Sequence, residues 1–382
     1  MKKIAVLYGT RPEFVKVAPI LELLSKSEKF ELISISTGQH AEMLTQMEDQ
    51  FQIYPSVTLN IFKPGQTLSE IVQKTLAGLE QFFQSNMPDL FVVQGDTTSA
   101  MTGALAAFYR GIPVAHVEAG LRSFDLANPF PEEANRKVIS QLSALHLAPT
   151  PLAAQNLKAE GIKPETIIVT GNTVIDSLAM SKEWNVTFSD DRVSKILSAS
   201  NPYILITTHR RENIGAGMAS ICDAIFKLAE ANPNINFLFP MHKNPAVREA
   251  MSRLQENKNV VLCEPLSYAE FVKAMSSAFL AVTDSGGVQE EAPAFKVPVL
   301  VLRDTTERPE AIDAGVARLI GTNTERIISE VTNLINHSTE YLEMASGASP
   351  YGDGEAAKRI LGVIENFFGG KERIEPFNPA AR

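Results

Sequence analysis

Short apolar runs of strand length alternate with helix-length segments along the whole chain. This alternation is typical of βα units around parallel sheets. The runs fall into two series, separated by a more polar and less periodic stretch over 182–202. The first series predicts strands at 4–8, 32–36, 90–94, 113–117, 145–148 and 166–170, and the second at 203–207, 236–239, 260–263, 278–282, 299–302 and 317–320.

The two series predict an α/β protein with two Rossmann-like domains, which suits a chain of 382 residues. We expect residues 1–181 to form the first domain and 200–354 the second. Residues 355–382 are expected to be a helix and tail that pack back on the first domain. Two parallel sheets facing each other would leave a cleft at the carboxyl ends of their strands, where open α/β sheets bind ligands.

Composition narrows the class of protein. A content of 45% hydrophobic and 21% charged residues is that of a soluble globular protein. The net charge of -9 argues against a general nucleic-acid or membrane-surface role, although a local basic site for an anion remains compatible with it. No apolar run suits a signal peptide or a bilayer span, so we expect a cytoplasmic protein. Cys222 and Cys263 are far apart and are expected to be buried apolar residues.

The segment 283–291 predicts a phosphate pocket. It follows an apolar run and precedes a helix-forming stretch. Ser285 suits a helix N-cap, and Gly286 and Gly287 would let backbone N–H groups approach an anion. Glu291 would then reach a ribose. An ordinary turn before a helix explains these residues equally well.

Other nucleotide and metal motifs do not occur. The first strand-to-helix turn, Gly9 to Glu13, lacks the GxGxxG of dinucleotide-binding proteins, and there is no Walker or HExxH pattern. Kinase and zinc-hydrolase interpretations are therefore disfavoured. We expect no cofactor and no metal.

Polar side chains gather where the predicted strands end. Acids dominate in the first domain, whereas Arg, His and glycine turns dominate in the second. This division suits a substrate with an anionic leaving group on one side and acid/base chemistry on the other. The candidates in the first domain are Arg11, Lys16, Gln39, His40, Asp96, Glu118, Arg122, Glu132, Glu133, Asn135 and Arg136, and in the second His209, Arg210, Arg211, Glu212, His242, Asn244, Ser285, Arg303, Glu307 and Arg308.

Each candidate also has a purely structural interpretation. Asp96 alone is better explained as the cap of a helix beginning at Thr97. Glu132 and Glu133 suit the first turn of a helix whose first position is Pro131. Glu118 is harder to explain structurally, because a charge that follows a buried strand requires exposure or a partner.

The motifs together resemble the non-hydrolysing UDP-N-acetylglucosamine 2-epimerase family of bacteria. The resemblance covers nearly the whole chain and implies a GT-B-like fold, a homodimer and reversible interconversion of UDP-GlcNAc with UDP-ManNAc. The segments that carry it are 9–13 with Lys16, 95–97, 116–122, 131–136, 171–173, 209–212, 284–293 and 303–308.

The resemblance also implies roles for individual residues. Those expected in catalysis are Asp96, Glu118, Glu132 and His209. Those expected to bind substrate are Arg11, Ser285, Gly286 and Gly287 at the diphosphate, Glu291 at the ribose, Phe271 at the uracil, and Lys16, Arg136 and Arg308 at sugar and phosphate. A second UDP-GlcNAc is expected as an activator beside Gln39, His40 and His242. Leu266 and Gly65 depart from some relatives, at the uracil and activator contacts respectively.

The expected chemistry needs no redox cofactor. The C2 hydrogen of the sugar becomes acidic once UDP leaves C1, which permits elimination to a glycal and return of a proton to the opposite face. Alternatives remain open from sequence: a hydrolysing epimerase that releases ManNAc and UDP, a GT-B glycosyltransferase, a nucleotide-sugar sensor, and a nicotinamide-dependent epimerase.

Overall fold

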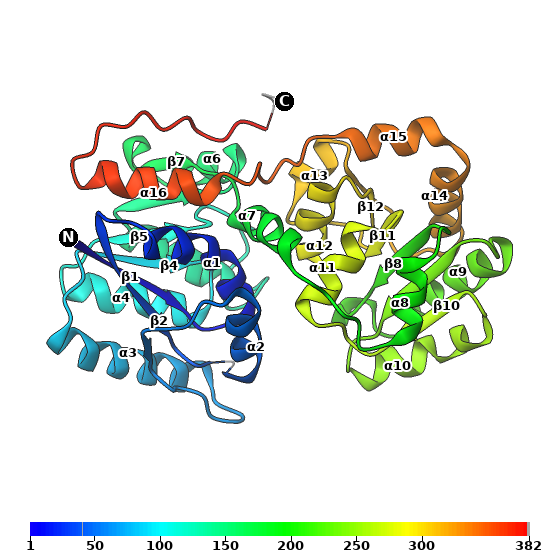
Figure 1. Ribbon diagram of the computed structural model, residues 1–382, viewed down its shortest axis with the longest axis horizontal. Coiled ribbons are helices and arrows are strands. Elements are labelled where there is room, and N and C mark those ends of the chain that lie inside the picture. Colours follow the sequence, from blue (N-terminus) through cyan, green and yellow to red (C-terminus); the bar gives the residue numbers. More distant parts are fainter. Residues whose placement is uncertain (40, 380–382) are drawn as a thin grey trace. The chain divides into compact units, whose positions relative to one another are not determined.

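The computed structural model describes residues 1–39 and 41–379, without the side chains of residues 41–43 and 211. These residues form two compact units (Figure 1). Of the described residues, the first unit combines Met1–Met180 with 351–379, and the second is Ser181–Pro350. Each has its own parallel sheet, which confirms the α/β class. The segment 182–199, which lies outside both predicted domains, belongs to the second unit.

A seven-stranded sheet forms the centre of the first unit, in the order β3-β2-β1-β4-β5-β6-β7. All neighbouring strands are parallel. The strands are β1 (Lys2–Tyr8), β2 (Phe30–Ser36), β3 (Val57–Thr58), β4 (Leu90–Gln94), β5 (Val114–Val117), β6 (Leu145–Ala148) and β7 (Ile167–Val169). The six predicted strands are all present, and the short edge strand β3 is an addition.

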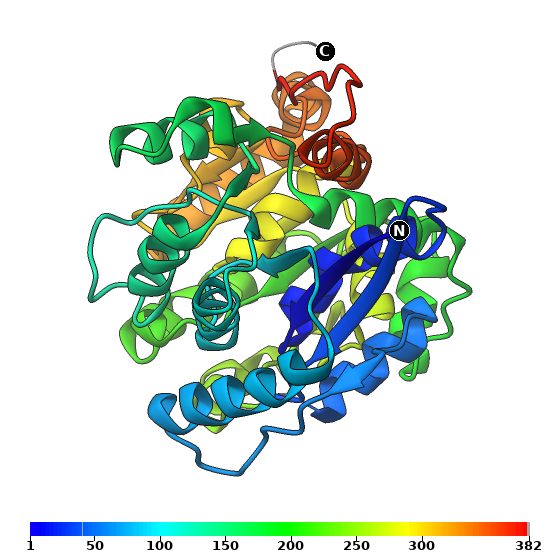
Figure 2. The same ribbon diagram turned by 90° about the vertical axis from the view of Figure 1, so that its left-hand side faces the viewer.

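Helices cover both faces of this sheet (Figure 2). On one face α3 (Leu68–Ser85), α4 (Thr98–Tyr109) and α5 (Glu132–Leu142) pack in series, and on the other α1 (Arg11–Ser25) contacts α2 (Ala41–Phe51), α7 (Thr173–Met180) and α16 (Ala356–Phe367). Helix α6 (Pro151–Ala159) packs against β6 and β7. The core beneath α3 and α4 is apolar and includes the buried rings of Phe83 and Phe91.

The chain returns to the first unit after the second is complete. Asn172 donates its backbone N–H to the Tyr351 carbonyl at 2.6 Å, and Gly171, with φ +88°, leaves room for Gly352 beside it. Further on, the buried Phe377 donates its N–H to the Val169 carbonyl of the edge strand β7 at 2.8 Å. The segment 171–173 is therefore the docking point of the returning chain, and the tail covers a strand edge.

Asp176 of α7 holds the start of α16. Its carboxylate accepts the N–H groups of Ala356 at 3.3 Å and Ala357 at 2.8 Å. Burial raises the pKa of Asp176 from 3.8 to about 6, against the lowering effect of these hydrogen bonds. The fold is thus more stable with this carboxyl protonated.

Asp176→Asn is expected to change how stability depends on pH. Because the folded pKa is the higher one, the contribution of Asp176 is complete below about pH 4 and is lost as the pH rises through about 6. The loss is at most about 3 kcal/mol. We expect the unfolding temperature of the wild type, relative to the variant, to fall between about pH 4 and pH 7. The same difference for the exposed Asp125→Asn should stay flat, and a flat difference for Asp176→Asn would contradict the interpretation.

The second unit repeats the architecture with a six-stranded parallel sheet in the order β10-β9-β8-β11-β12-β13. All six predicted strands are present. They are β8 (Tyr203–Thr207), β9 (Asn236–Pro240), β10 (Val260–Cys263), β11 (Leu280–Thr283), β12 (Val299–Val301) and β13 (Ala317–Leu319). The helices are α8 (Asp191–Ser198), α9 (Ala216–Ala231), α10 (Pro245–Met251), α11 (Tyr268–Ser276), α12 (Gly286–Glu291), α13 (Pro309–Asp313), α14 (Thr324–Asn336) and α15 (Ser338–Ser346).

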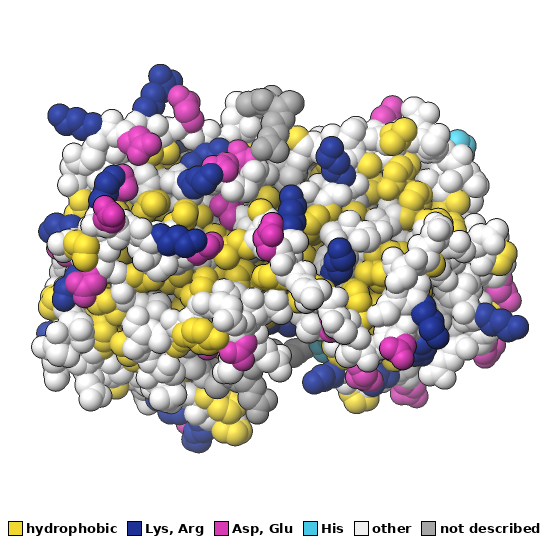
Figure 3. Space-filling view, viewed as in Figure 1, with side chains coloured by type: hydrophobic (Ala, Val, Ile, Leu, Met, Phe, Trp, Pro, Cys, Tyr) yellow, Lys and Arg dark blue, Asp and Glu magenta, His cyan; other side chains and the backbone are white. Residues whose placement is uncertain are grey.

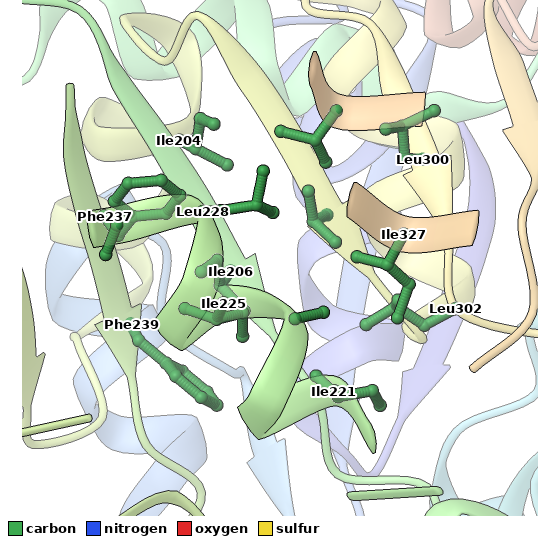
Figure 4. Close-up of a cluster of buried hydrophobic side chains, with 14 of the residues drawn as sticks. Ile204, Ile206, Ile221, Ile225, Leu228, Phe237, Phe239, Leu300, Leu302 and Ile327 are labelled. Atoms are coloured by element: carbon green, nitrogen blue, oxygen red, sulfur yellow. The ribbon is translucent and has the colours of Figure 1, made fainter. Parts of the chain in front are cut away.

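The core of the second unit lies between this sheet and helices α9, α10 and α14. Figure 4 shows Ile206 and Phe237 of the sheet facing Ile225 and Leu228 of α9, with Ile327 of α14 beside them. Both cysteines are buried and free, as expected. Well-packed cores of this kind make each strand end a fixed platform for a polar side chain.

The surface carries charges of both signs. Figure 3 shows Lys and Arg side chains interspersed with Asp and Glu on the face in view, without a basic field. Across the described residues, no helix combines the length and the apolar character needed to cross a membrane.

Candidate functional site

The predicted polar residues lie at the carboxyl ends of the strands in each unit. In the first sheet the strand order reverses between β1 and β4, and in the second between β8 and β11. Open α/β sheets bind ligands at such switch points. Arg11 follows β1 and Asp96 follows β4, while His209 follows β8 and Ser285 follows β11. Each unit therefore has its own candidate cluster at the expected place.

Glu118 directly follows β5 and is held in an unusual backbone conformation. Its φ is +65°, which is uncommon for a residue with a side chain and is found often at functional sites. The side chain is 8% exposed, forms an ion pair with Lys16 of α1, and accepts a hydrogen bond from Gln94 Nε2 at 3.1 Å. The required partner is thus present, and the carboxylate is oriented from two elements.

Asp96 faces the start of α5. Arg136 binds its Oδ2 through Nη2 at 2.6 Å and Nε at 2.9 Å, and Asn135 binds its backbone carbonyl at 2.8 Å. Burial opposes the charge on Arg136, but Asp96 and Glu133 outweigh it and raise its pKa. The capping interpretation of Asp96 is wrong, because Thr97 is the N-cap of α4 and accepts the Ala100 N–H at 3.0 Å.

The two neighbouring acids of α5 differ in their surroundings. Glu133 is fully buried and accepts the N–H groups of Ser123 at 2.9 Å and Phe124 at 3.2 Å, so it shapes the preceding loop. Glu132 has a buried Oε2 without a hydrogen-bond partner among the described residues. Pro131 is the N-cap of α5 rather than its first residue, one position from the prediction. Of these two acids, only Glu132 therefore keeps an oxygen without a hydrogen bond from the described residues.

The other candidates of the first unit include residues that remain candidates for ligand binding and one residue with a structural role. Arg11 is exposed at the first position of α1. Gln39 accepts the Ser99 hydroxyl at 2.6 Å, whereas His40 lies outside the described residues. Arg122 is buried and binds Glu160 at 2.7 Å, which makes it a structural residue.

In the second unit, Asp284 fixes the turn that carries His209. Asp284 is 0% exposed and accepts the N–H groups of His209 and Arg210, each at 2.9 Å, and the Thr208 hydroxyl at 2.7 Å. Burial would raise the pKa of Asp284, but these hydrogen bonds and the nearby imidazole lower it to about 2. The His209 ring is 41% exposed, with Nδ1 3.2 Å from Asp284 Oδ1.

His242 lies beside His209. The two rings are stacked, with centroids 5.7 Å apart and an interplanar angle of 24°. His242 Nδ1 accepts the Asn244 N–H at 3.1 Å. The residue predicted for the activator region and the residue predicted for catalysis are therefore in contact.

The Ser285 turn and Arg308 form one candidate anion site. Ser285 is the N-cap of α12, as predicted, and its side chain makes no capping hydrogen bond. A Cβ added at Gly286 would lie 2.5 Å from Arg308 Nη1, so only glycine admits the guanidinium here. Glu290 at 2.6 Å and Glu307 at 2.6 Å hold this guanidinium in place.

Glu307 organises the arginines of this turn. It binds Arg303 at 2.7 Å and Arg210 at 3.2 Å in addition to Arg308. Burial would raise the pKa of Glu307, but the arginines and hydrogen bonds lower it to about 2. Glu291 ends α12 and Phe271 lies on α11, both partly buried. The second unit thus combines positive side chains with backbone N–H groups near one strand end.

The sequence did not reveal the supporting roles of three residues. Glu13 binds Thr97, Gln94 binds Glu118, and Asp284 holds the turn that carries His209. Each acts through a hydrogen bond to a residue far away in the chain, which no local spacing reveals. Within the described residues there is also no group of three His, Cys, Asp or Glu side chains placed to hold a metal ion.

The fold and the two clusters define a protein of the GT-B-like α/β class. The sequence model of the UDP-N-acetylglucosamine 2-epimerase family matches residues 22–365. The UDP-N-acetylglucosamine 2-epimerase of Escherichia coli (strain K12) is 45% identical over 372 residues, which cover 95% of this chain and 98% of that protein. The chain therefore belongs to the UDP-N-acetylglucosamine 2-epimerase family.

Solved structures agree. A putative UDP-N-acetylglucosamine 2-epimerase from Listeria monocytogenes is 42% identical with a TM-score of 0.92, covering 99% of this chain and 100% of that chain. The UDP-GlcNAc 2-epimerase from Neisseria meningitidis, solved bound to UDP-GlcNAc, is 43% identical with a TM-score of 0.86, covering 96% and 100%.

Proposed function

We propose that this protein reversibly epimerises UDP-GlcNAc to UDP-ManNAc at C2, by elimination of UDP and its re-addition. One observation carries the proposal. Asp96 and Glu118 follow the neighbouring strands β4 and β5, and each is paired with a cation that keeps it oriented. Two oriented carboxylates at the carboxyl end of one sheet suit proton transfer better than sugar transfer or simple binding.

The proposed reaction balances without an oxidant. The C1–O bond to UDP breaks, its electron pair leaves with the diphosphate, and a carboxylate takes the C2 proton, which gives 2-acetamidoglucal. In the return step the UDP oxygen adds to C1 while a proton is delivered to the opposite face of C2. General acid/base catalysis of this kind typically contributes about 10²–10⁴-fold.

The acid/base work is assigned to Asp96, Glu118 and Glu132. Glu132 is the acid whose Oε2 has no hydrogen-bond partner in the described part of the chain. Lys16 and Arg136 bind the sugar and phosphate as well as orienting their carboxylates.

UDP is assigned to the second unit. The Ser285 turn, with Gly286 and Gly287, would donate backbone N–H groups to the diphosphate, and Arg308 would neutralise its charge. Arg11 is proposed as a further phosphate-binding residue. Glu291 would bind the ribose and Phe271 the uracil. His209, held by Asp284, would stabilise the charge that develops on the departing phosphate.

We also propose the regulation and the assembly that the family resemblance implies. A second UDP-GlcNAc is proposed to bind near Gln39, His40 and His242 as an activator, and the protein is proposed to be a homodimer. The product would supply ManNAc-type precursors for surface polysaccharides, and the cytoplasmic location stays a prediction.

Proton NMR of the purified protein with UDP-GlcNAc in deuterated water, without added cofactor, tests the reaction. We expect UDP-ManNAc to appear with deuterium at C2. Free ManNAc with UDP would instead identify a hydrolysing epimerase. An unchanged spectrum despite UDP binding would contradict the proposal and favour a transferase or sensor.

A further inference from the structure

Glu13 is a buried carboxylate at the third position of α1. It is 2% exposed, and its Oε2 accepts the N–H groups of Gly9 at 3.0 Å and Thr10 at 2.7 Å. The bond from Thr10 is the reach-back of a capping box, a common way to begin a helix. That local role uses only one of the two carboxylate oxygens.

The other carboxylate oxygen accepts a hydrogen bond from outside this helix. Glu13 Oε1 accepts the hydroxyl of Thr97 at 2.6 Å, across 84 positions of sequence. Thr97 is itself the N-cap of α4, and its oxygen accepts the Ala100 N–H. One carboxylate thus joins the turn after β1 to the turn after β4.

A second capping box in the same unit shows what the local role alone looks like. Glu70 of α3 accepts the Thr67 N–H at 2.8 Å and binds Lys63 at 2.8 Å, so its partners all lie within its own segment. Glu70 remains partly exposed. Burial raises the pKa of Glu13 although hydrogen bonds from Thr97, Thr10 and Gly9 lower it, whereas hydrogen bonds from Lys63 and Thr67 lower the pKa of Glu70 to about 2. Capping therefore does not explain why Glu13 is buried.

The two turns that Glu13 joins carry residues of the proposed site. Arg11 lies two positions before Glu13, and Asp96 directly precedes Thr97. Strands β1 and β4 are adjacent in the sheet, on either side of the switch point. The turns are also tightly packed, because a Cβ at Gly9 would overlap Thr37 Oγ1 and lie 3.3 Å from Ser99 Oγ.

We infer that Glu13 is a positioning residue of the epimerase reaction, which holds the Asp96 turn and the Arg11 turn in fixed register through Thr97. The inference rests on the proposed function, since it assigns Glu13 an effect on the proton transfer at Asp96 and on the diphosphate contact of Arg11. Misplacing a reacting group by about 1 Å can cost about 10²-fold in rate.

Four variants test the inference, using the same NMR assay at a fixed interval below each unfolding temperature. Glu13→Ala removes the capping box of α1 and the link between the turns, whereas Thr97→Val removes that link and the cap of α4 but keeps the capping box of α1. Both are expected to lower kcat for C2 deuterium exchange by about 10- to 100-fold. Only Glu13→Ala should also raise KM, because the turn that carries Arg11 then loses its hydrogen bonds to the Glu13 carboxylate. Glu13→Gln and Thr97→Ser can restore the link and should stay within about threefold of wild type.

Matched controls separate positioning from stability. Glu70→Ala loses a capping box, and Thr150→Val loses the buried N-cap of α6, whose side chain accepts the Ala153 N–H at 3.1 Å. Both should retain kcat. The inference is overturned if Thr97→Val matches Thr150→Val in kcat, or if Glu13→Gln is as impaired as Glu13→Ala. A wild type that forms no UDP-ManNAc would instead refute the proposed function, and the inference with it.

Discussion

Asp96→Asn is expected to lower kcat for epimerisation by about 10²–10⁴-fold, with little change in stability. The amide keeps an oxygen for Arg136 but cannot take up a proton, so geometry and acid/base chemistry are separated. Formation of UDP-ManNAc and C2 deuteration should fall together in the NMR assay. If only one of these two signals were lost, Asp96 would not be the group that takes the C2 proton as UDP departs.

Asp89→Asn is the matched control for this variant. Asp89 precedes β4, whereas Asp96 follows it, and Asp89 is also paired with a cation, Lys2, at 2.7 Å. This variant should epimerise at the wild-type rate. If Asp96→Asn kept more than about a tenth of wild-type activity, Asp96 would not be the main acid or base.

Gly286→Ala is expected to weaken UDP binding by about 10- to 100-fold, which corresponds to the loss of one charge-assisted hydrogen bond. The added methyl group would occupy the place of the Arg308 guanidinium, 2.5 Å from Nη1. Displacing Arg308 also loosens its ion pairs with Glu290 and Glu307, so the unfolding temperature of the variant is measured alongside. Calorimetric titration with UDP measures the effect directly.

Gly217→Ala provides the comparison in the same unit. A Cβ there would meet Thr322 at 3.6 Å, an ordinary contact, near the start of α9. UDP affinity should be unchanged. Equal affinity for Gly286→Ala and wild type would show that the Ser285 turn does not hold the diphosphate.

The strands could be predicted from sequence because buried parallel strands are continuous apolar runs. Strand β3 could not, since Val57–Thr58 is too short to give such a run and is defined only by pairing with β2. Asp176 likewise shows no local sign that it holds α16, because its partners come 180 residues later. Local patterns therefore predicted the long strands, whereas strand β3 and the role of Asp176 depend on pairing with distant parts of the chain.

The candidate residues show the same limit. Strand-end position was enough to select Asp96, Glu118, His209 and Ser285. It could not separate Glu132 from Glu133, because both occupy the first turn of α5 and only the surrounding loop makes one of them structural. Nor could it assign the helix cap to Thr97 rather than to Asp96, since both residue types cap helices well.

The return of α16 to α1 bears on how the protein is made. During synthesis, residues 181–350 emerge from the ribosome before the segment that completes the first unit. The second unit can therefore finish folding first, while the face of α1 that packs against α16 stays uncovered until α16 has been synthesised. The half of the protein that is synthesised first is therefore the last to be completed.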